Sequence, residues 1–117
     1  MNKEQMSEAI KKCPVVAILR GITPDEVIGV CDALAERGIG LIEITMNSPE
    51  ALKSIKLAAD HFKNSSVGIG AGTVLSPKDV EAVAEAGGEY IISPNSDPAV
   101  IRMTKELGLL SLPGVFT

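Results

Sequence analysis

Gly40-Leu-Ile-Glu-Ile-Thr-Met-Asn-Ser48 is the stretch that decides the fold, because it is an almost wholly apolar run with one carboxylate, Glu43, in its middle. Side chains alternate between the two faces of a strand, so Leu41, Glu43 and Thr45 share one face and the isoleucines share the other. A run this apolar predicts a strand covered on both faces, as in a parallel sheet flanked by helices.

Glu43 would then project into a closed interior near the end of its strand. Leaving water costs an ionised carboxylate several kcal/mol, so a buried one usually has a partner or a chemical role. Burial would raise the pKa of Glu43, which suits a general acid or base. The alternative is a structural carboxylate paired with a buried Arg or Lys, and the sequence leaves both interpretations open.

The rest of the chain repeats a strand followed by a helix, with a period of about 25 residues. The expected strands span residues 14–20, 40–45, 67–71, 90–93 and 109–112, and the expected helices span 3–13, 23–38, 47–62, 75–87 and 97–107. Four of the helices are entered through Ser, Thr or Asp followed by proline. In particular, Asn47-Ser-Pro-Glu50 predicts the N-cap of the third helix.

This alternation predicts an α/β fold with a parallel sheet. Two architectures fit, an open doubly wound sheet and a (β/α)8 TIM barrel. Five strands are expected, whereas a closed barrel needs eight. The chain is therefore either an open sheet or the N-terminal five βα units of a barrel, and we expect residues 1–117 to form a single domain.

Composition excludes several classes of partner. Apolar residues make up 45% of the chain and aromatic residues 3%, so the core must be built from Ala, Val, Ile and Leu. A net charge of −4 without a long basic cluster argues against nucleic acid or an anionic membrane as partner. There is no CxxC motif, no signal peptide and no membrane span, which predicts a reduced, cytoplasmic protein.

Polar residues gather where the expected strands end, and in both architectures the functional edge lies at the carboxyl ends of the strands. Those ends carry, in order, Arg20, then Glu43, Thr45 and Asn47, then Gly72 and Thr73, then Ser93, Pro94 and Asn95, and last Pro113 and Gly114. A cation, an acid and several hydroxyls would share one rim. This arrangement predicts a site for a small acidic metabolite.

Each of these side chains also has a structural interpretation. Arg20 could hold a substrate carboxylate through paired hydrogen bonds, or it could form an internal ion pair with Glu43. Thr73 could donate to a substrate oxygen or cap its strand. Gly68-Ile-Gly-Ala-Gly72 lacks the glycine spacing of a dinucleotide-binding turn, which disfavours a nucleotide binder. His61, the only histidine, is expected on the surface with no metal-ligand cluster around it.

Five motifs together resemble one family. They are Ala17-Ile-Leu-Arg-Gly-Ile22, Leu41-Ile-Glu-Ile-Thr-Met-Asn-Ser-Pro49, Gly70-Ala-Gly-Thr-Val-Leu75, Ile92-Ser-Pro-Asn95 and Leu112-Pro-Gly-Val-Phe-Thr117. In this order and at this spacing, they are similar to the 2-keto-3-deoxy-6-phosphogluconate (KDPG) and 4-hydroxy-2-oxoglutarate (KHG) aldolases of bacteria. The resemblance covers nearly the whole chain from Pro14 onward.

The resemblance implies a (β/α)8 barrel, usually a homotrimer, that carries out class I aldol cleavage without a metal or other cofactor. A lysine forms a Schiff base with the substrate's keto group, the C3–C4 bond breaks, and pyruvate leaves with a phosphorylated aldehyde as co-product. By motif match, Glu43 would be the acid/base. Arg20 and Thr73 would hold the pyruvyl carboxylate and nearby oxygens, Pro94 would line the pocket, and Thr45 and Asn47 would complete the substrate-binding set.

The chain departs from the family pattern in two places. Many gluconate-type members carry Arg where this chain has Asn47, and the Met-Asn-Ser-Pro form is closer to the galactonate-type aldolases. In the family, the Schiff-base lysine lies on the sixth strand, after the Pro-Gly-x-x-Thr turn that ends here at Thr117. The lysines at 3, 11, 12, 53, 56, 63, 78 and 105 all fall on expected helices, helix ends or loops.

We therefore expect a chain that is truncated before its nucleophile and inactive alone. The alternative is a non-catalytic half-barrel that acts as an oligomerising module, because its outer strands would leave unpaired edges and an exposed inner face.

Overall fold

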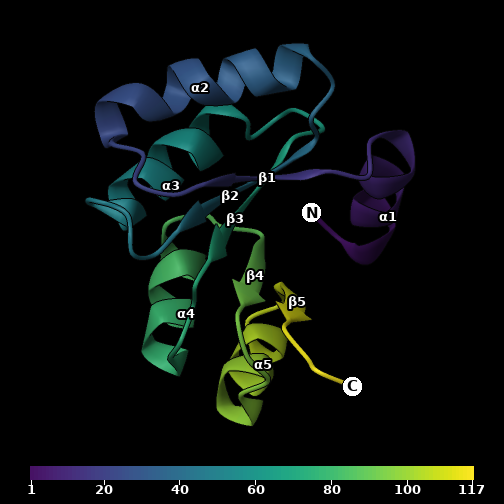
Figure 1. Ribbon diagram of the computed structural model, residues 1–117, viewed down its shortest axis with the longest axis vertical. Helices are drawn as coiled ribbons and strands as arrows, with labels where there is room; N and C mark the ends of the chain where they lie inside the picture. The colour runs from purple at the N-terminus through teal and green to yellow at the C-terminus, as the bar shows by residue number, and fades with distance from the viewer.

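The computed structural model describes residues 1–117. Helices and parallel strands alternate along the chain (Figure 1). The strands are β1 (Val16–Leu19), β2 (Leu41–Thr45), β3 (Gly68–Gly72), β4 (Tyr90–Ser93) and β5 (Leu110–Pro113). The helices are α1 (Lys3–Lys12), α2 (Pro24–Glu36), α3 (Ala51–His61), α4 (Pro77–Glu85) and α5 (Pro98–Glu106). Every predicted strand and helix is present, with shifts of a few residues at the ends.

The order of the strands decides between the two architectures. A doubly wound sheet reverses its strand order at a switch point. Here the order is β1-β2-β3-β4-β5, and each strand pairs in parallel with the next one in the chain. The outer strands β1 and β5 each have a neighbour on one side only. This is the N-terminal part of a (β/α)8 barrel, and the open doubly wound alternative is wrong.

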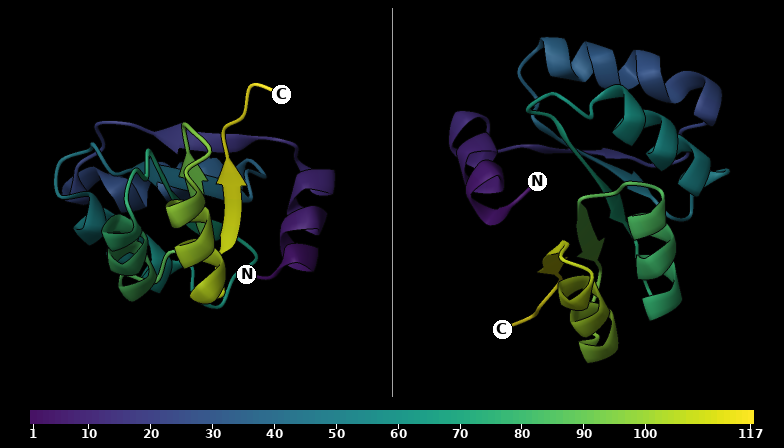
Figure 2. Two further views of the ribbon diagram at one scale, coloured as in Figure 1. Left: turned by 90° about the horizontal axis from the view of Figure 1, so that it is seen from below. Right: turned by 180° about the vertical axis from the view of Figure 1, so that it is seen from behind.

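Helices α2 to α5 cover one face of the sheet (Figures 1 and 2). Their apolar side chains form the main core with the side chains that the strands present to this face. The strands contribute Ile42, Ile44, Ile69, Ala71 and Ile91, and the helices contribute Val27, Cys31, Ile55, Ala58, Val80, Val83 and Val100. Apart from Cys31, these are small aliphatic residues of the kinds that the composition predicts for the core.

The other face, which we call the inner face, is packed only where the strands begin. Met6, Leu41 and Tyr90 form a second, smaller cluster there, and α1 lies beside this end of the sheet, apart from the other helices (Figure 2). Gly70 makes room for the Tyr90 ring, because a Cβ atom at position 70 would lie 2.3 Å from the ring carbons. The inner face toward the strand ends is left for polar side chains.

The start of α3 corrects one sequence prediction. The Asn47–Glu50 segment is a turn, and the helix begins at Ala51 with Glu50 as its N-cap in a left-handed conformation, at φ 46°. Ser48 cannot cap the helix because its hydroxyl is engaged by Thr45 and by the backbone N–H of Gly21. At the other Pro-headed helices, Thr23, Ser76 and Asp97 are the N-caps, as predicted.

The longest helix, α2, has 13 residues. None of the helices combines the length and the apolar character that crossing a membrane would require. Cys13 is half-buried and Cys31 is buried, and neither forms a disulfide. Burial raises the pKa of the Cys31 thiol to about 11, so this cysteine stays a small neutral core residue.

Candidate active site

Glu43 is buried on the inner face with an exposed fraction of only 4%. Its Oε2 atom has no hydrogen-bond partner. It fits because position 72 is glycine: a Cβ atom there would lie 1.7 Å from Oε2. Burial raises the pKa of Glu43, and the charge of Arg20 opposes that shift without cancelling it. A buried carboxyl group without a partner is suited to exchanging protons.

Arg20 forms no ion pair with Glu43. Its Nη1 atom donates to Oδ1 of Asn47 at 2.9 Å. Both terminal nitrogens also lie 3.4 Å from Oγ1 of Thr73. The structural ion pair considered from the sequence is therefore absent, and the exposed guanidinium keeps donors available for an anion.

Thr73 follows β3 directly and is held in the left-handed region, at φ 56°. A threonine rarely adopts this conformation, and such backbone strain tends to be concentrated at functional sites. The turn places the Thr73 hydroxyl against the Arg20 guanidinium. Three segments far apart in the sequence, which follow β1, β2 and β3, are thus connected through Arg20.

A cavity of about 190 Å³ opens beside these groups at the carboxyl ends of the strands. It is lined by Ile18, Arg20, Glu43, Thr73, Ile92, Ser93 and Pro94. Four of the predicted site residues, namely Arg20, Glu43, Thr73 and Pro94, therefore meet at one cavity. Of the remaining two, Asn47 contacts Arg20, whereas the Thr45 hydroxyl bonds to Ser48.

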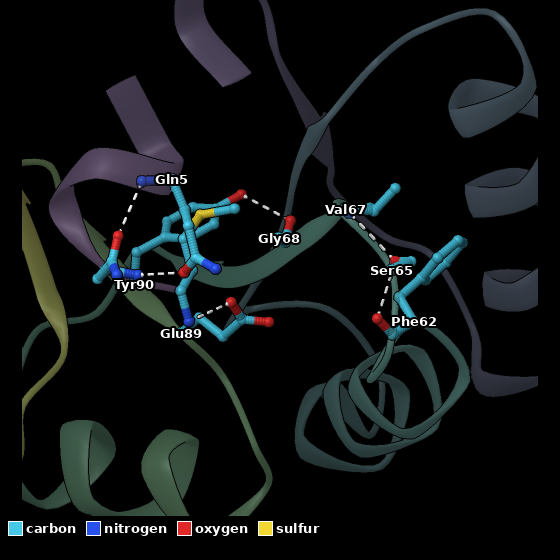
Figure 3. A network of polar contacts seen from close by, with 9 residues as sticks. Gln5, Phe62, Ser65, Val67, Gly68, Glu89 and Tyr90 are labelled. Carbon is cyan, nitrogen blue, oxygen red and sulfur yellow. Dashed lines mark hydrogen bonds and ion pairs between the residues drawn. The ribbon is translucent and has the colours of Figure 1, made fainter. Parts of the chain in front are cut away.

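A larger hollow of about 890 Å³ lies between α1 and the opposite end of the sheet. Figure 3 shows hydrogen bonds in this region of the chain: the Tyr90 hydroxyl lies 3.5 Å from the carbonyl oxygen of Gly68, and the Ser65 hydroxyl donates to the carbonyl of Phe62 and accepts from the backbone N–H of Val67. We place the site at the smaller cavity, because parallel α/β folds carry their chemistry at the carboxyl ends of the strands.

Sequence reasoning missed two residues of this region. Gly72 was recognised only as part of a Gly-rich strand end, and Ser48 only as part of a helix cap. None of the eight lysines lines the cavity, and all of them are exposed on the helices or in the loop after α3. The described residues thus supply an acid/base candidate and an anion-binding side chain but no amine near them.

The fold and the cavity define the class: this is part of a (β/α)8-barrel protein with a cavity at its strand ends. The family model for KDPG and KHG aldolases matches residues 6–117. The chain belongs to this aldolase family.

Among curated proteins, the “Probable 2-dehydro-3-deoxy-6-phosphogalactonate aldolase” of Rhizobium meliloti (strain 1021) is 48% identical over 104 residues, which are 89% of this chain and 49% of that protein. The 2-dehydro-3-deoxy-6-phosphogalactonate aldolase of Escherichia coli (strain K12) is 42% identical, over 91% of this chain and 51% of its own length. A 2-dehydro-3-deoxy-phosphogluconate aldolase of Pseudomonas aeruginosa is 31% identical, over 97% of this chain and 53% of its own length. The chain spans about half the length of the curated relatives it matches.

Solved structures agree with this assignment. A “Native KDPGal structure” superposes with a TM-score of 0.86 at 42% identity, over 91% of this chain and 51% of that one. KDPG aldolase from Legionella pneumophila, with pyruvate captured at low pH as a covalent carbinolamine intermediate, gives a TM-score of 0.84 at 27% identity, over 93% and 52%. A designed porous cage made by fusing symmetric oligomeric domains superposes with a TM-score of 0.83 at 41% identity, over 87% of this chain and 37% of that chain.

Proposed function

We propose that residues 1–117 form the N-terminal part of a class I aldolase that cleaves a 2-keto-3-deoxy-6-phospho-sugar acid to pyruvate and a phosphorylated aldehyde. The observation that carries this proposal is the buried, unpartnered carboxyl group of Glu43 beside a cavity that also holds Arg20 and Thr73. An acid of raised pKa next to an anion-binding group is what proton transfer on a keto acid requires.

Glu43 is the acid/base in this proposal. A Schiff-base cleavage needs a group that moves protons while the carbinolamine forms and loses water, and again when the enamine is protonated to release pyruvate. Glu43 suits both directions because burial brings its pKa closer to neutrality than that of an exposed glutamate.

Arg20 and Thr73 hold the pyruvyl carboxylate and its neighbouring oxygens. The guanidinium already contacts Thr73 and Asn47, so it is oriented before a ligand arrives. Asn47 positions Arg20, and Pro94 lines the cavity wall. Thr45, which bonds to Ser48, supports the turn that carries Asn47.

The galactonate type is the substrate class we favour. Identity to the galactonate aldolases is higher than to the gluconate-type relative, and Asn47 stands where many gluconate-type members carry Arg. The family places its Schiff-base lysine after the Pro-Gly-x-x-Thr motif, so we propose that the nucleophile belongs to a segment outside residues 1–117. Residues 1–117 alone would then form no Schiff base.

Intact mass after incubation with pyruvate and borohydride tests the position of the nucleophile. We expect the 117-residue chain to remain at 12.2 kDa, whereas the full-length E. coli relative, as positive control, gains one reduced pyruvyl group. A pyruvyl adduct on the 12.2 kDa chain would show that one of its own lysines is the nucleophile and would contradict this part of the proposal.

A chimera tests the role of Glu43. In the chimera, this chain replaces the matched half of the E. coli relative, and pyruvate release from 2-dehydro-3-deoxy-6-phosphogalactonate is measured. We expect Glu43→Gln to lower kcat by about 10²–10⁴-fold, the range of general acid–base contributions. Glu81→Gln, an exposed change on α4, is the matched control. A folded chimera that keeps its rate with Glu43→Gln would overturn the assignment.

We further propose that the complete protein is a cytoplasmic homo-oligomer, a trimer by family resemblance. The two unpaired cysteines fit a reducing compartment. The unpaired edges of β1 and β5 and the exposed side chain of Ile18, 58% accessible on β1, leave surface for further strands or subunits to cover. Light scattering at several protein concentrations would test the association.

A further inference from the structure

Ser48 makes contacts that the proposed chemistry does not use. Its side chain is buried, with an exposed fraction of 7%. The Oγ atom accepts a hydrogen bond from the backbone N–H of Gly21 at 2.9 Å and lies 2.9 Å from Oγ1 of Thr45. It also approaches the carbonyl oxygen of Leu19 at 3.5 Å. Since Ser48 has one proton to give, it donates to Leu19 when the Thr45 hydroxyl donates to it.

Leu19 and Gly21 are the two residues on either side of Arg20. The hydroxyl of Ser48 therefore holds the backbone before and after Arg20, while the neighbouring residue, Asn47, accepts a hydrogen bond from the Arg20 side chain. Two consecutive residues of the β2–α3 turn thus hold both the main chain around Arg20 and its guanidinium, although Arg20 lies 27 positions before Asn47 in the sequence.

These contacts restrict the motion of Arg20, whose side chain is otherwise exposed to solvent. A free arginine side chain carries about 2 kcal/mol of rotamer entropy, which a ligand must remove on binding. Gly21 also has a φ of 82°, a conformation that glycine adopts without cost, so the chain turns sharply just after Arg20. The anchor at this turn therefore adds to the contacts with Asn47 and Thr73 that orient the guanidinium beside the cavity.

We propose that Ser48 is a positioning residue for Arg20, which aligns the guanidinium for a substrate carboxylate by holding the backbone on both sides of it. The ligand side of this inference rests on the proposed function, whereas the effect of Ser48 on Arg20 does not. Ser48 would act only through Arg20 and would not contact the substrate.

The test uses the 117-residue chain with Ser48→Ala and with Ser48→Cys, which nearly keeps the side-chain volume but replaces a strong acceptor by a weak one. Ser54→Ala is the matched control, because Ser54 is a fully buried serine on α3 whose hydroxyl has no partner. Two quantities are measured: the ¹⁵N–¹H signals of the Arg20 guanidinium, whose separation reports hindered rotation, and the dissociation constant for pyruvate.

In both Ser48 variants we expect the Arg20 signals to merge and pyruvate to bind about tenfold more weakly, a factor that one lost hydrogen bond of typical strength supplies. Ser54→Ala should leave both quantities unchanged. In an Arg20→Ala background, Ser48→Ala should no longer alter pyruvate affinity, because alanine leaves no cationic side chain at position 20 for Ser48 to position.

Unchanged Arg20 signals in a folded Ser48 variant would overturn the proposal, and so would a Ser48→Ala effect on pyruvate affinity that persists in Arg20→Ala. If Ser48→Ala does not fold, Ser48→Cys decides by the same criteria. If the unmodified chain does not bind pyruvate, the proposed ligand is wrong for this chain, and the Arg20 signals alone then decide the role of Ser48.

Discussion

The two faces of β2 differ in what they contribute, although they alternate residue by residue along one short strand. On the helix-covered face, Ile42 and Ile44 are fully buried in the main core. On the inner face, Glu43 is nearly as buried, at 4% exposed, but its Oε2 atom has no partner. One face is filled by core side chains, and the other holds a buried carboxyl group without a partner, which we expect to cost stability. Burial alone therefore does not distinguish the two faces. Substitutions on the two faces should differ in their effects on the free energy of unfolding and on pyruvate binding.

Ile44→Ala should have the largest effect. Ile44 has no exposed surface and packs in the main core. Removing its side chain loses transfer free energy and leaves a cavity, which together lower the free energy of unfolding by about 3 kcal/mol. Urea denaturation measures the change. Leu57→Ala on α3, where the leucine is 39% exposed, is the control and should cost much less. Equal losses for the two variants would mean that the helix-covered face does not dominate stability.

Gly70→Ala examines the packed part of the inner face. The added methyl group would meet ring carbons of the buried Tyr90 at 2.3 Å. Because a ring in a filled core has little freedom to move, overpacking should cost about 2 kcal/mol in unfolding free energy. Gly29→Ala on α2 is the control: its Cβ would meet nothing within 4 Å, and alanine should stabilise the helix by roughly 0.5–1 kcal/mol. In the same denaturation experiment, Gly70→Ala should therefore lower the unfolding free energy and Gly29→Ala should raise it.

The helix-covered face of β2 could be predicted from the sequence because alternation and apolar runs are local signals. The positions of Ile42 and Ile44 followed from the period of the strand, and the Pro-headed caps at Ser76 and Asp97 followed from adjacent residues. The same local reasoning failed at Ser48, where a Ser-Pro pair was interpreted as a helix cap. The hydroxyl is engaged by Gly21, a residue 27 positions away that no local pattern brings to it.

The candidate site was predictable only as a set of residues. Parallel strands bring their ends to one edge, so Arg20, Glu43 and Thr73 could be expected near one another. Their actual contacts could not, because the choice of Arg20 between Glu43 and Asn47 depends on side-chain geometry across three turns. The hydrogen bond between Nε2 of His61 on α3 and Oδ1 of Asp32 on α2, at 2.8 Å, was missed for the same reason, although the histidine is on the surface as predicted.

Glu43→Gln should move stability in the direction opposite to Ile44→Ala. Burial raises the pKa of Glu43 above the value in the unfolded chain, about 4.3. The folded state therefore holds the proton at higher pH than the unfolded state does, and the free energy of unfolding falls as the pH rises above that value. Glutamine keeps the volume and carries no charge, so the variant should lack this decline and be the more stable protein at neutral pH.

Urea denaturation of both proteins at a series of pH values between about 4 and 8 measures this difference. The gap between the two unfolding free energies should open as the pH rises. Glu81→Gln on α4, where the glutamate is exposed, is the control and should run parallel to the unmodified chain. A gap that closes with rising pH would mean that the Glu43 carboxylate is stabilised in the fold, which the unpartnered Oε2 contradicts.

Thr73→Gly should have the smallest effect on stability and the most specific effect on binding. Two non-glycine residues have a positive φ, Thr73 at 56° and Glu50 at 46°. Glycine relieves roughly 1–2 kcal/mol of left-handed strain but adds about 0.5–1 kcal/mol of freedom to the unfolded chain, which leaves a net gain of about 0.5 kcal/mol at either position.

Thr73→Gly also removes the hydroxyl that contacts Arg20, whereas Glu50→Gly changes an exposed residue before α3. Both variants should melt slightly higher, and only Thr73→Gly should bind pyruvate more weakly. Because the two changes relieve the same kind of strain, a difference in affinity between them can come only from the inner face. Equal affinities would mean that the strain at Thr73 serves the turn after β3 and not the site.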